Sequence, residues 1–171
     1  MDLKPYIREV PDFPKPGILF RDITPLLAET SALNSAIDRM IELCEPLRPD
    51  AIVSVEARGF LFAAPLAYRM EKPLVPVRKQ GKLPYKTHSA SYDLEYGTDT
   101  LEIHRDGIGN GQRVLIVDDL LATGGTVSAA AKLVRECGAS VAGYAFLIEL
   151  ASLNGRQLLD GGDVVSLIIY E

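Results

Sequence analysis

Hydrophobic and polar positions follow two patterns that alternate along the chain. Apolar runs typical of buried strands begin at residues 51 and 114 and cover 74–77, 140–150 and 164–170. Apolar residues recur at helical spacing in 31–45 and 127–137, and 51–70 combines a strand, a tight turn and a helix. This alternation predicts an α/β fold with an open, twisted, mainly parallel sheet flanked by helices.

A glycine-rich loop follows the central apolar run, in the segment 114–126 with the sequence VLIVDDLLATGGT. Backbone N–H groups of this loop and the positive end of the next helix would converge on a phosphate. The candidate phosphate-binding residues are Ala122, Thr123, Gly124, Gly125 and Thr126. No Lys follows the glycines, so the loop is not a nucleoside triphosphate loop of the GxxxxGK[ST] type. Alternatively, the glycine pair only turns the chain.

Two acids, Asp118 and Asp119, lie at the predicted carboxyl end of this central strand. Open α/β sheets bind their ligands at that edge. A carboxylate can accept hydrogen bonds from both vicinal hydroxyls of a ribose, so acids beside a phosphate loop indicate a sugar phosphate. The alternative is that the acids simply end a strand.

A second anion-binding turn is predicted in 56–59, where Arg58 would add its charge to the N–H groups at a helix start. A further basic cluster, Arg78, Lys79 and Lys82, surrounds a glycine after the strand at 74–77. These cations could hold a diphosphate. They could also form an ordinary solvated surface.

Two further segments lack helical periodicity. Residues 11–25 are rich in proline and are expected to form an ordered loop without regular structure, in which Phe20 either packs on the core or stacks on a planar base. Residues 81–109 predict a long hairpin with a mobile tip, and Glu95 and Tyr96 lie at its centre. Such an excursion is either disordered or a functional lid.

Composition limits the remaining possibilities. The 171 residues, of which 47% are hydrophobic, suit one domain, and the net charge of −5 argues against a nucleic-acid partner. No apolar run has the length of a membrane span and the N-terminus lacks a signal-like apolar segment, so a cytoplasmic protein without membrane contact is expected. The two cysteines, Cys44 and Cys137, are expected to be buried free thiols.

The run VLIVDDLLATGGT resembles the phosphoribosyl pyrophosphate (PRPP) signature of type I phosphoribosyltransferases. With FPKPGILFRDITP, EARGFLFA, RKQGKLP and SYDLEYGTDTLEIH in the same order, nearly the whole chain resembles the adenine phosphoribosyltransferase family. Ala64 stands where the EARGFLFG-like pattern often has Gly, while Arg58 and Gly59 are retained.

The resemblance implies that PRPP and adenine are the substrates, that AMP and pyrophosphate are the products, and that Mg²⁺ is bound mainly through PRPP, with possible help from Asp118 or Asp119. It implies a single domain over 1–171, with a base-side hood in 1–30 and a mobile catalytic loop in 81–109. Homodimers are common in the family, so a homodimer is expected.

The resemblance also assigns roles to individual residues. Asp118 and Asp119 resemble the acids that bind the ribose, and Glu95 with Tyr96 resembles the closing loop, with Glu95 next to the adenine. The 5′-phosphate loop corresponds to 122–126. Pyrophosphate ligands would be Arg58, Arg78, Lys79 and Lys82, and the adenine side would be formed by Leu19, Phe20 and Arg21.

Two other functions stay open at this point. One is a phosphoribosyltransferase for another purine, such as hypoxanthine, guanine or xanthine. The other is a PRPP-sensing regulator without catalysis, although the chain length leaves no room for a DNA-binding module.

Overall fold

The computed structural model describes residues 1–94 and 97–171. Contacts within the backbone divide the chain into two compact units, Met1–Arg39 and Met40–Glu171. The boundary falls inside helix α2 (Thr30–Cys44), which matches the amphipathic helix predicted over 31–45. Each unit is described separately below, and the expectation of a single domain stays a prediction.

The first unit begins with a short 3₁₀ helix η1 (Lys4–Tyr6) and an antiparallel pair of strands, β1 (Arg8–Pro11) and β2 (Leu19–Asp22). Helix α1 (Thr24–Ala28) follows. The expectation that 11–25 lacks regular structure was therefore wrong. The prolines are compatible with these elements because Pro11 ends an edge strand and Pro25 lies in the first turn of α1, where a missing N–H is tolerated.

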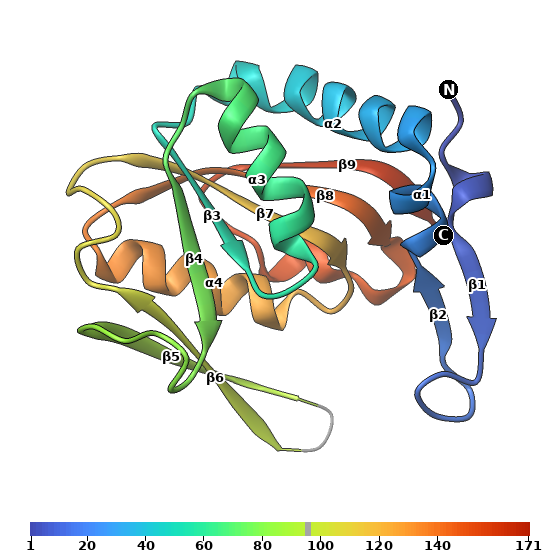
Figure 1. The fold of residues 1–171 in the computed structure, drawn as a ribbon. Helices are drawn as coiled ribbons and strands as arrows, with labels where there is room; N and C mark the ends of the chain where they lie inside the picture. The colour runs from blue at the N-terminus through green and yellow to red at the C-terminus, as the bar shows by residue number, and fades with distance from the viewer. Residues whose placement is uncertain (95–96) are drawn as a thin grey trace. The chain divides into compact units, whose positions relative to one another are not determined.

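The second unit is built on a seven-stranded sheet with the order β5-β6-β4-β3-β7-β8-β9 (Figure 1). Strands β4, β3, β7, β8 and β9 run parallel to one another, while β5 and β6 form an antiparallel hairpin whose strand β6 pairs antiparallel with β4. Their bounds are β3 (Ala51–Val55), β4 (Leu74–Lys79), β5 (Thr87–Asp93), β6 (Thr98–His104), β7 (Arg113–Leu121), β8 (Ser140–Leu150) and β9 (Asp163–Tyr170). This confirms the predicted mainly parallel sheet.

Helices α3 (Gly59–Met70) and α4 (Gly125–Glu136) cover opposite faces of this sheet (Figure 1). The arrangement follows from connection handedness. From β3 the chain crosses through α3 to β4 on one side, whereas from β7 it crosses through α4 to β8 on the other side. Right-handed crossovers in opposite directions place their helices on opposite faces, and the strand order reverses between β3 and β7.

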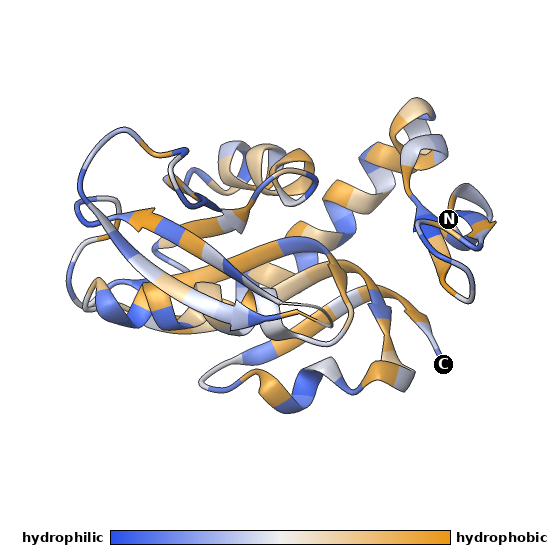
Figure 2. Cartoon of the chain, turned by 90° about the horizontal axis from the view of Figure 1, so that it is seen from below, coloured by the Kyte–Doolittle hydropathy of each residue, from blue (hydrophilic) through white to orange (hydrophobic). Residues whose placement is uncertain are grey.

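The core of the second unit lies between the sheet and its helices, and Figure 2 shows the hydrophobic colouring concentrated along the central strands. All residues of β3 and most of β7 and β8 are buried, as expected for strands covered on both faces. Cys44 is fully buried, which raises the pKa of its thiol to about 12, and Cys137 is half-buried. Both are free thiols, as expected.

The connection between β8 and β9 contains two 3₁₀ helices, η3 (Ala151–Leu153) and η4 (Gly155–Leu158). Asn154 separates them with a left-handed backbone, φ 55°, which a continuous helix cannot contain. A further 3₁₀ turn, η2 (Glu45–Leu47), follows α2. Among the described residues, no helix is both long and apolar enough to span a membrane.

Candidate active site

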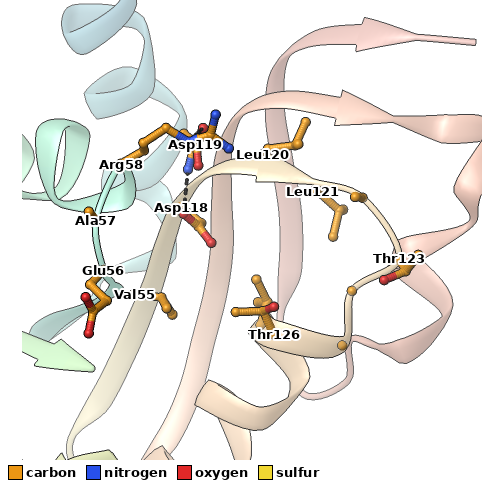
Figure 3. A pocket seen from close by; sticks show the side chains of 14 residues that line it. Val55, Glu56, Ala57, Arg58, Asp118, Asp119, Leu120, Leu121, Thr123 and Thr126 are labelled. Carbon is orange, nitrogen blue, oxygen red and sulfur yellow. Dashed lines mark hydrogen bonds and ion pairs between the residues drawn. The ribbon is translucent and has the colours of Figure 1, made fainter. Parts of the chain in front are cut away.

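A pocket of about 250 Å³ opens where the strand order reverses, at the carboxyl ends of β3 and β7 (Figure 3). Residues 55–58 and 118–127 line it. They include both predicted acids, Arg58 and all five residues of the predicted phosphate loop. The structure therefore brings together in one cavity two segments that are about 60 positions apart in the sequence, at the place where open α/β sheets bind ligands.

The phosphate loop leads directly into helix α4. Gly124 precedes the helix with φ 88°, a left-handed conformation that favours glycine, and Gly125 is the first helical residue. The first N–H groups of a helix have no intrahelical acceptor, and the positive end of the helix dipole lies at the same place. Thr123 and Thr126 add hydroxyl groups to the pocket wall. The loop can thus bind a phosphate through backbone and hydroxyl donors.

Asp118 and Asp119 are held by a strand that is longer than predicted. Strand β7 continues to Leu121, whereas its pairing with β3 ends at Val117 opposite Ser54. On the other side, β7 stays paired with β8 beyond the acids, up to Leu121. The two carboxylates therefore lie beside the pocket past the end of β3, on a backbone that the sheet still fixes.

Arg58 caps the start of α3 and forms an ion pair with Asp119, with 3.0 Å between Nε and Oδ2 (Figure 3). Burial raises the pKa of Asp119, although the charge of Arg58 opposes this shift. Burial and the neighbouring Asp119 raise the pKa of Asp118 well above its usual range. A cation that enters the pocket would favour the ionised form of both acids and so counteract these shifts.

Gly59 allows the close packing that places Asp118. A Cβ atom at position 59 would lie 2.6 Å from Ser54 Oγ and 2.7 Å from Asp118 Oδ1. Ser54 is itself fully buried and donates to the Val117 carbonyl at 2.8 Å. Asp118 Oδ1 also accepts the Asp119 N–H at 2.9 Å. The first residue of α3 therefore must be small for the Asp118 carboxylate to occupy this position.

Glu56 contacts all three basic residues of the turn, a role that is not visible in the sequence. Its carboxylate accepts hydrogen bonds from the backbone N–H of Lys79 at 2.7 Å and from the Lys82 ammonium at 2.6 Å. Arg78 Nε lies 3.4 Å from Glu56 Oε1. Burial opposes ionisation of Glu56, but its bonds to Lys82 and Lys79 and the charge of Arg78 lower its pKa overall. Because Glu56 also lines the pocket, it connects these cations to the site.

The hairpin contributes a second carboxylate to this basic turn. Asp99 on β6 pairs with the Lys79 ammonium at 3.0 Å, and this bond is the main reason why the pKa of Asp99 is lowered. The Tyr92 hydroxyl on β5 lies 3.4 Å from Asp99 and also interacts with the Thr126 side chain. The part of the hairpin next to its turn thus contacts residues of both predicted anion sites.

Three predicted site residues belong to the first unit: Leu19, Phe20 and Arg21 lie on β2. Phe20 packs edge-to-face with Phe13 at 5.1 Å between ring centroids, and Arg21 forms an ion pair with Glu9. None of the three is among the lining residues of the pocket in the second unit, and their role on the adenine side stays a prediction. Glu95 and Tyr96 lie outside the described residues.

The donor atoms of the pocket fit a magnesium ion carried by a substrate. Mg²⁺ prefers oxygen ligands and usually takes one or two carboxylates together with water and substrate phosphates. Asp118 and Asp119 supply such carboxylates in this pocket. No group of three metal-ligating side chains was found in 1–94 and 97–171, so among these residues the protein does not offer a complete cage.

A glycine-rich loop beside two acids, at the point where the strand order reverses, agrees with the site expected of a phosphoribosyltransferase. The phosphoribosyl transferase domain profile matches residues 23–167. An adenine phosphoribosyltransferase from a Synechococcus strain is 57% identical over 171 residues, covering 100% of both chains, and one from Solibacter usitatus is 58% identical over 170 residues, covering 99% and 98%. The chain belongs to the adenine phosphoribosyltransferase family.

Solved structures agree with this assignment. The crystal structure of adenine phosphoribosyltransferase from Thermoanaerobacter pseudethanolicus has a TM-score of 0.96 and 56% identity, covering 98% of each chain. The Saccharomyces cerevisiae enzyme, crystallised with an iminoaltritol bisphosphate and adenine, has a TM-score of 0.91 and 40% identity, covering 96% of each chain.

We predict that Gly59→Ala lowers turnover because the new Cβ must displace the Asp118 carboxylate or Ser54. We expect kcat to fall about tenfold or more, and overpacking of this kind typically destabilises a protein by roughly 1–3 kcal/mol. Steady-state kinetics and thermal unfolding of the same preparation measure the two effects. A variant that is destabilised but keeps the wild-type kcat would contradict the positioning of Asp118 by this glycine.

Proposed function

We propose that this protein is an adenine phosphoribosyltransferase of purine salvage, which transfers the 5-phosphoribosyl group of PRPP to N9 of adenine. The products are AMP and pyrophosphate. The observation that carries the proposal is the single pocket in which a phosphate loop, two acids and Arg58 meet, in a chain with full-length relatives of this name. Adenine is part of the proposal because the relatives are named for it and the yeast relative was crystallised with it.

Each part of the pocket matches one part of PRPP. The loop at 122–126 would bind the 5′-phosphate, and Asp118 and Asp119 would accept hydrogen bonds from the ribose hydroxyls. Arg58 and the turn that carries Arg78, Lys79 and Lys82 would bind the pyrophosphate. Glu56 supports this assignment because one carboxylate holds the three residues of that turn next to the pocket.

The reaction places opposite charges on the ribose and on the leaving pyrophosphate. As the bond from C1 to the pyrophosphate breaks, positive charge builds on the ribose and negative charge on the pyrophosphate. The cations would stabilise the negative charge on the pyrophosphate, and Asp118 and Asp119 would stabilise the positive charge on the ribose. A Mg²⁺ ion bound to PRPP would neutralise further negative charge on the leaving group, with Asp118 or Asp119 as its protein ligand.

Adenine binding is proposed for the first unit. Leu19, Phe20 and Arg21 correspond to the base-side segment of the family, and Leu19 is 44% exposed, so part of its apolar surface is accessible. Backbone groups near these residues would read the base edge. Residues 1–30 would act as the hood, within one domain that covers 1–171.

The loop at 81–109 is proposed to close over the reactants and exclude water from C1. Glu95 would approach the adenine imidazole ring and help to remove its proton, with Tyr96 beside it. Within this segment, β5 and β6 form a paired hairpin. We further propose a homodimer in the cytoplasm, with PRPP and adenine as ligands and without a nucleic-acid or membrane partner.

We predict strong preference for adenine over hypoxanthine, guanine and xanthine. A site that donates to N1 and accepts from the 6-amino group has the wrong polarity for a 6-oxopurine, and each mispaired buried group costs about 1–3 kcal/mol. We expect kcat/KM for adenine to be about a hundredfold higher or more. The measurement supplies PRPP and Mg²⁺ with each purine in turn and quantifies the nucleotide formed. Comparable efficiency with a 6-oxopurine would refute the assignment to adenine.

We predict that Asp118→Asn and Asp119→Asn both lower kcat, whereas Thr126→Ala mainly raises KM for PRPP. The acids serve the reacting ribose, while Thr126 would bind a phosphate whose contacts change little during the reaction. Steady-state kinetics with varied PRPP separates these effects. If both asparagine variants fold and turn over at the wild-type rate, the ribose role is wrong.

We predict that Glu95→Gln lowers kcat by about tenfold or more, since general acid–base assistance is typically worth about 10² to 10⁴-fold. The KM for PRPP should change less. Asp93→Asn is the matched control, because Asp93 is an exposed acid at the end of β5 in the same hairpin. The test applies where chemistry is shown to limit the rate. Wild-type turnover of Glu95→Gln there would leave the loop as a lid without a proton role.

A further inference from the structure

Gly155, at the start of η4, lies directly against the phosphate loop. It is buried, and a Cβ atom at position 155 would lie 2.3 Å from the Ala122 carbonyl oxygen and 2.9 Å from Leu121 Cδ1. Conversely, a Cβ atom at Gly124 would lie 2.5 Å from the Gly155 carbonyl oxygen. Two glycines therefore meet with their backbones in contact, one in the loop and one behind it. No side chain fits between them.

The segment that carries Gly155 is fixed by its neighbour Arg156. Its guanidinium donates to both oxygens of Glu149, with 2.5 Å from Nε to Oε1 and 2.7 Å from Nη2 to Oε2. The Arg156 Nη1 also donates to the Val164 carbonyl at 2.9 Å, and Ser166 Oγ donates to Glu149 at 2.6 Å. Arg156 thus joins η4 to the ends of β8 and β9.

The ion pair between Arg156 and Glu149 holds η4 firmly against β8. Glu149 is 4% exposed, and a two-pronged arginine–carboxylate contact fixes orientation as well as distance. The hydrogen bonds from Arg156 lower the pKa of Glu149, so the carboxylate stays charged at neutral pH. Glu149 belongs to β8, which pairs with β7 next to the loop. The sheet therefore supports the loop from two directions, through β7 and through Arg156 and Gly155.

We propose that Gly155 and Arg156 are positioning residues that brace the 122–126 loop in its phosphate-binding conformation. The inference rests on the proposed function, because the ligand of this loop is taken to be the 5′-phosphate of PRPP. A glycine-rich loop has many accessible conformations, and ordering them on binding reduces affinity. Backbone contact with Gly155 restricts the loop before the ligand arrives, so its N–H groups already converge.

The test substitutes Gly155→Ala and uses Gly162→Ala as a steric control. A Cβ at Gly162 would lie 2.8 Å from the backbone of Gly143, so the clash is similar, but it occurs before β9 at the opposite edge of the sheet. Both variants should lose stability in thermal unfolding. For Gly155→Ala alone, we expect the Kd of ribose 5-phosphate and the KM of PRPP to rise about tenfold. The Kd of pyrophosphate, titrated by calorimetry, should stay within about twofold.

Several outcomes would overturn the brace. Ribose 5-phosphate binding within about twofold of wild type in Gly155→Ala would do so, as would equal weakening in Gly162→Ala. If Gly155→Ala does not fold, Arg156→Lys provides the second test, since it keeps the charge but loses the two-pronged contact. We expect about threefold weaker ribose 5-phosphate binding for that variant. Unchanged binding there would also overturn the proposal.

The control for Arg156→Lys is Arg113→Lys. Arg113 donates through Nη2 to the Leu47 carbonyl at 3.0 Å and starts β7, far along the strand from the loop.

A failure of the proposed function would give a different result. Wild-type protein that binds ribose 5-phosphate but makes no AMP from adenine and PRPP would refute the function and leave the brace intact. Wild-type protein without ribose 5-phosphate binding would overturn both.

Discussion

The site depends on close packing at three glycines. Gly59 lets α3 begin against Asp118, while Gly124 and Gly155 let the phosphate loop rest on η4. A single methyl group would collide with Ser54 and Asp118 at position 59, and with backbone oxygens at positions 124 and 155, at distances of 2.3–2.7 Å. Anion binding by N–H groups requires this close approach, because main-chain donors reach a ligand only where no side chain intervenes.

Electrostatics gives the site a second constraint. The chain as a whole carries −5, yet each predicted cation of the site has a carboxylate partner at a defined distance. Arg58 pairs with Asp119, Arg78 and Lys82 pair with Glu56, and Lys79 pairs with Asp99. Lysine and arginine side chains lose considerable rotamer entropy when they are ordered, and these carboxylates provide part of that order in advance. A polyanionic ligand therefore meets cations that already have fixed positions.

Much of the fold and of the pocket could be predicted from the sequence because both depend on local patterns. Apolar runs identify the buried strands, and their alternation with helical segments indicates a mainly parallel sheet with helices on both faces. The loop at 122–126 and the two acids lie within one short segment, so the sequence alone shows that they are close together.

Other features depend on contacts between distant segments and leave no local signal. Glu56 is an isolated acid in a turn, and its bonds to Lys79 and Lys82 form only because β3 and β4 are neighbours in the sheet. Gly155 looks like an ordinary turn residue until its contact with Ala122 is known. Regular structure in 11–25 was missed because prolines are unfavourable in most strand and helix positions, although edge strands and first helical turns accept them.

The extension of β7 beyond the end of β3 limits the backbone freedom of the two acids. Asp118 and Asp119 lie on backbone that is paired with β8 on one side, so they would lose little chain entropy on binding a ribose as proposed. The entropic cost of forming the complex would then fall on the segments outside the sheet. In the proposed enzyme the ribose-binding acids would be rigid, and adaptation to the ligands would be confined to the loops.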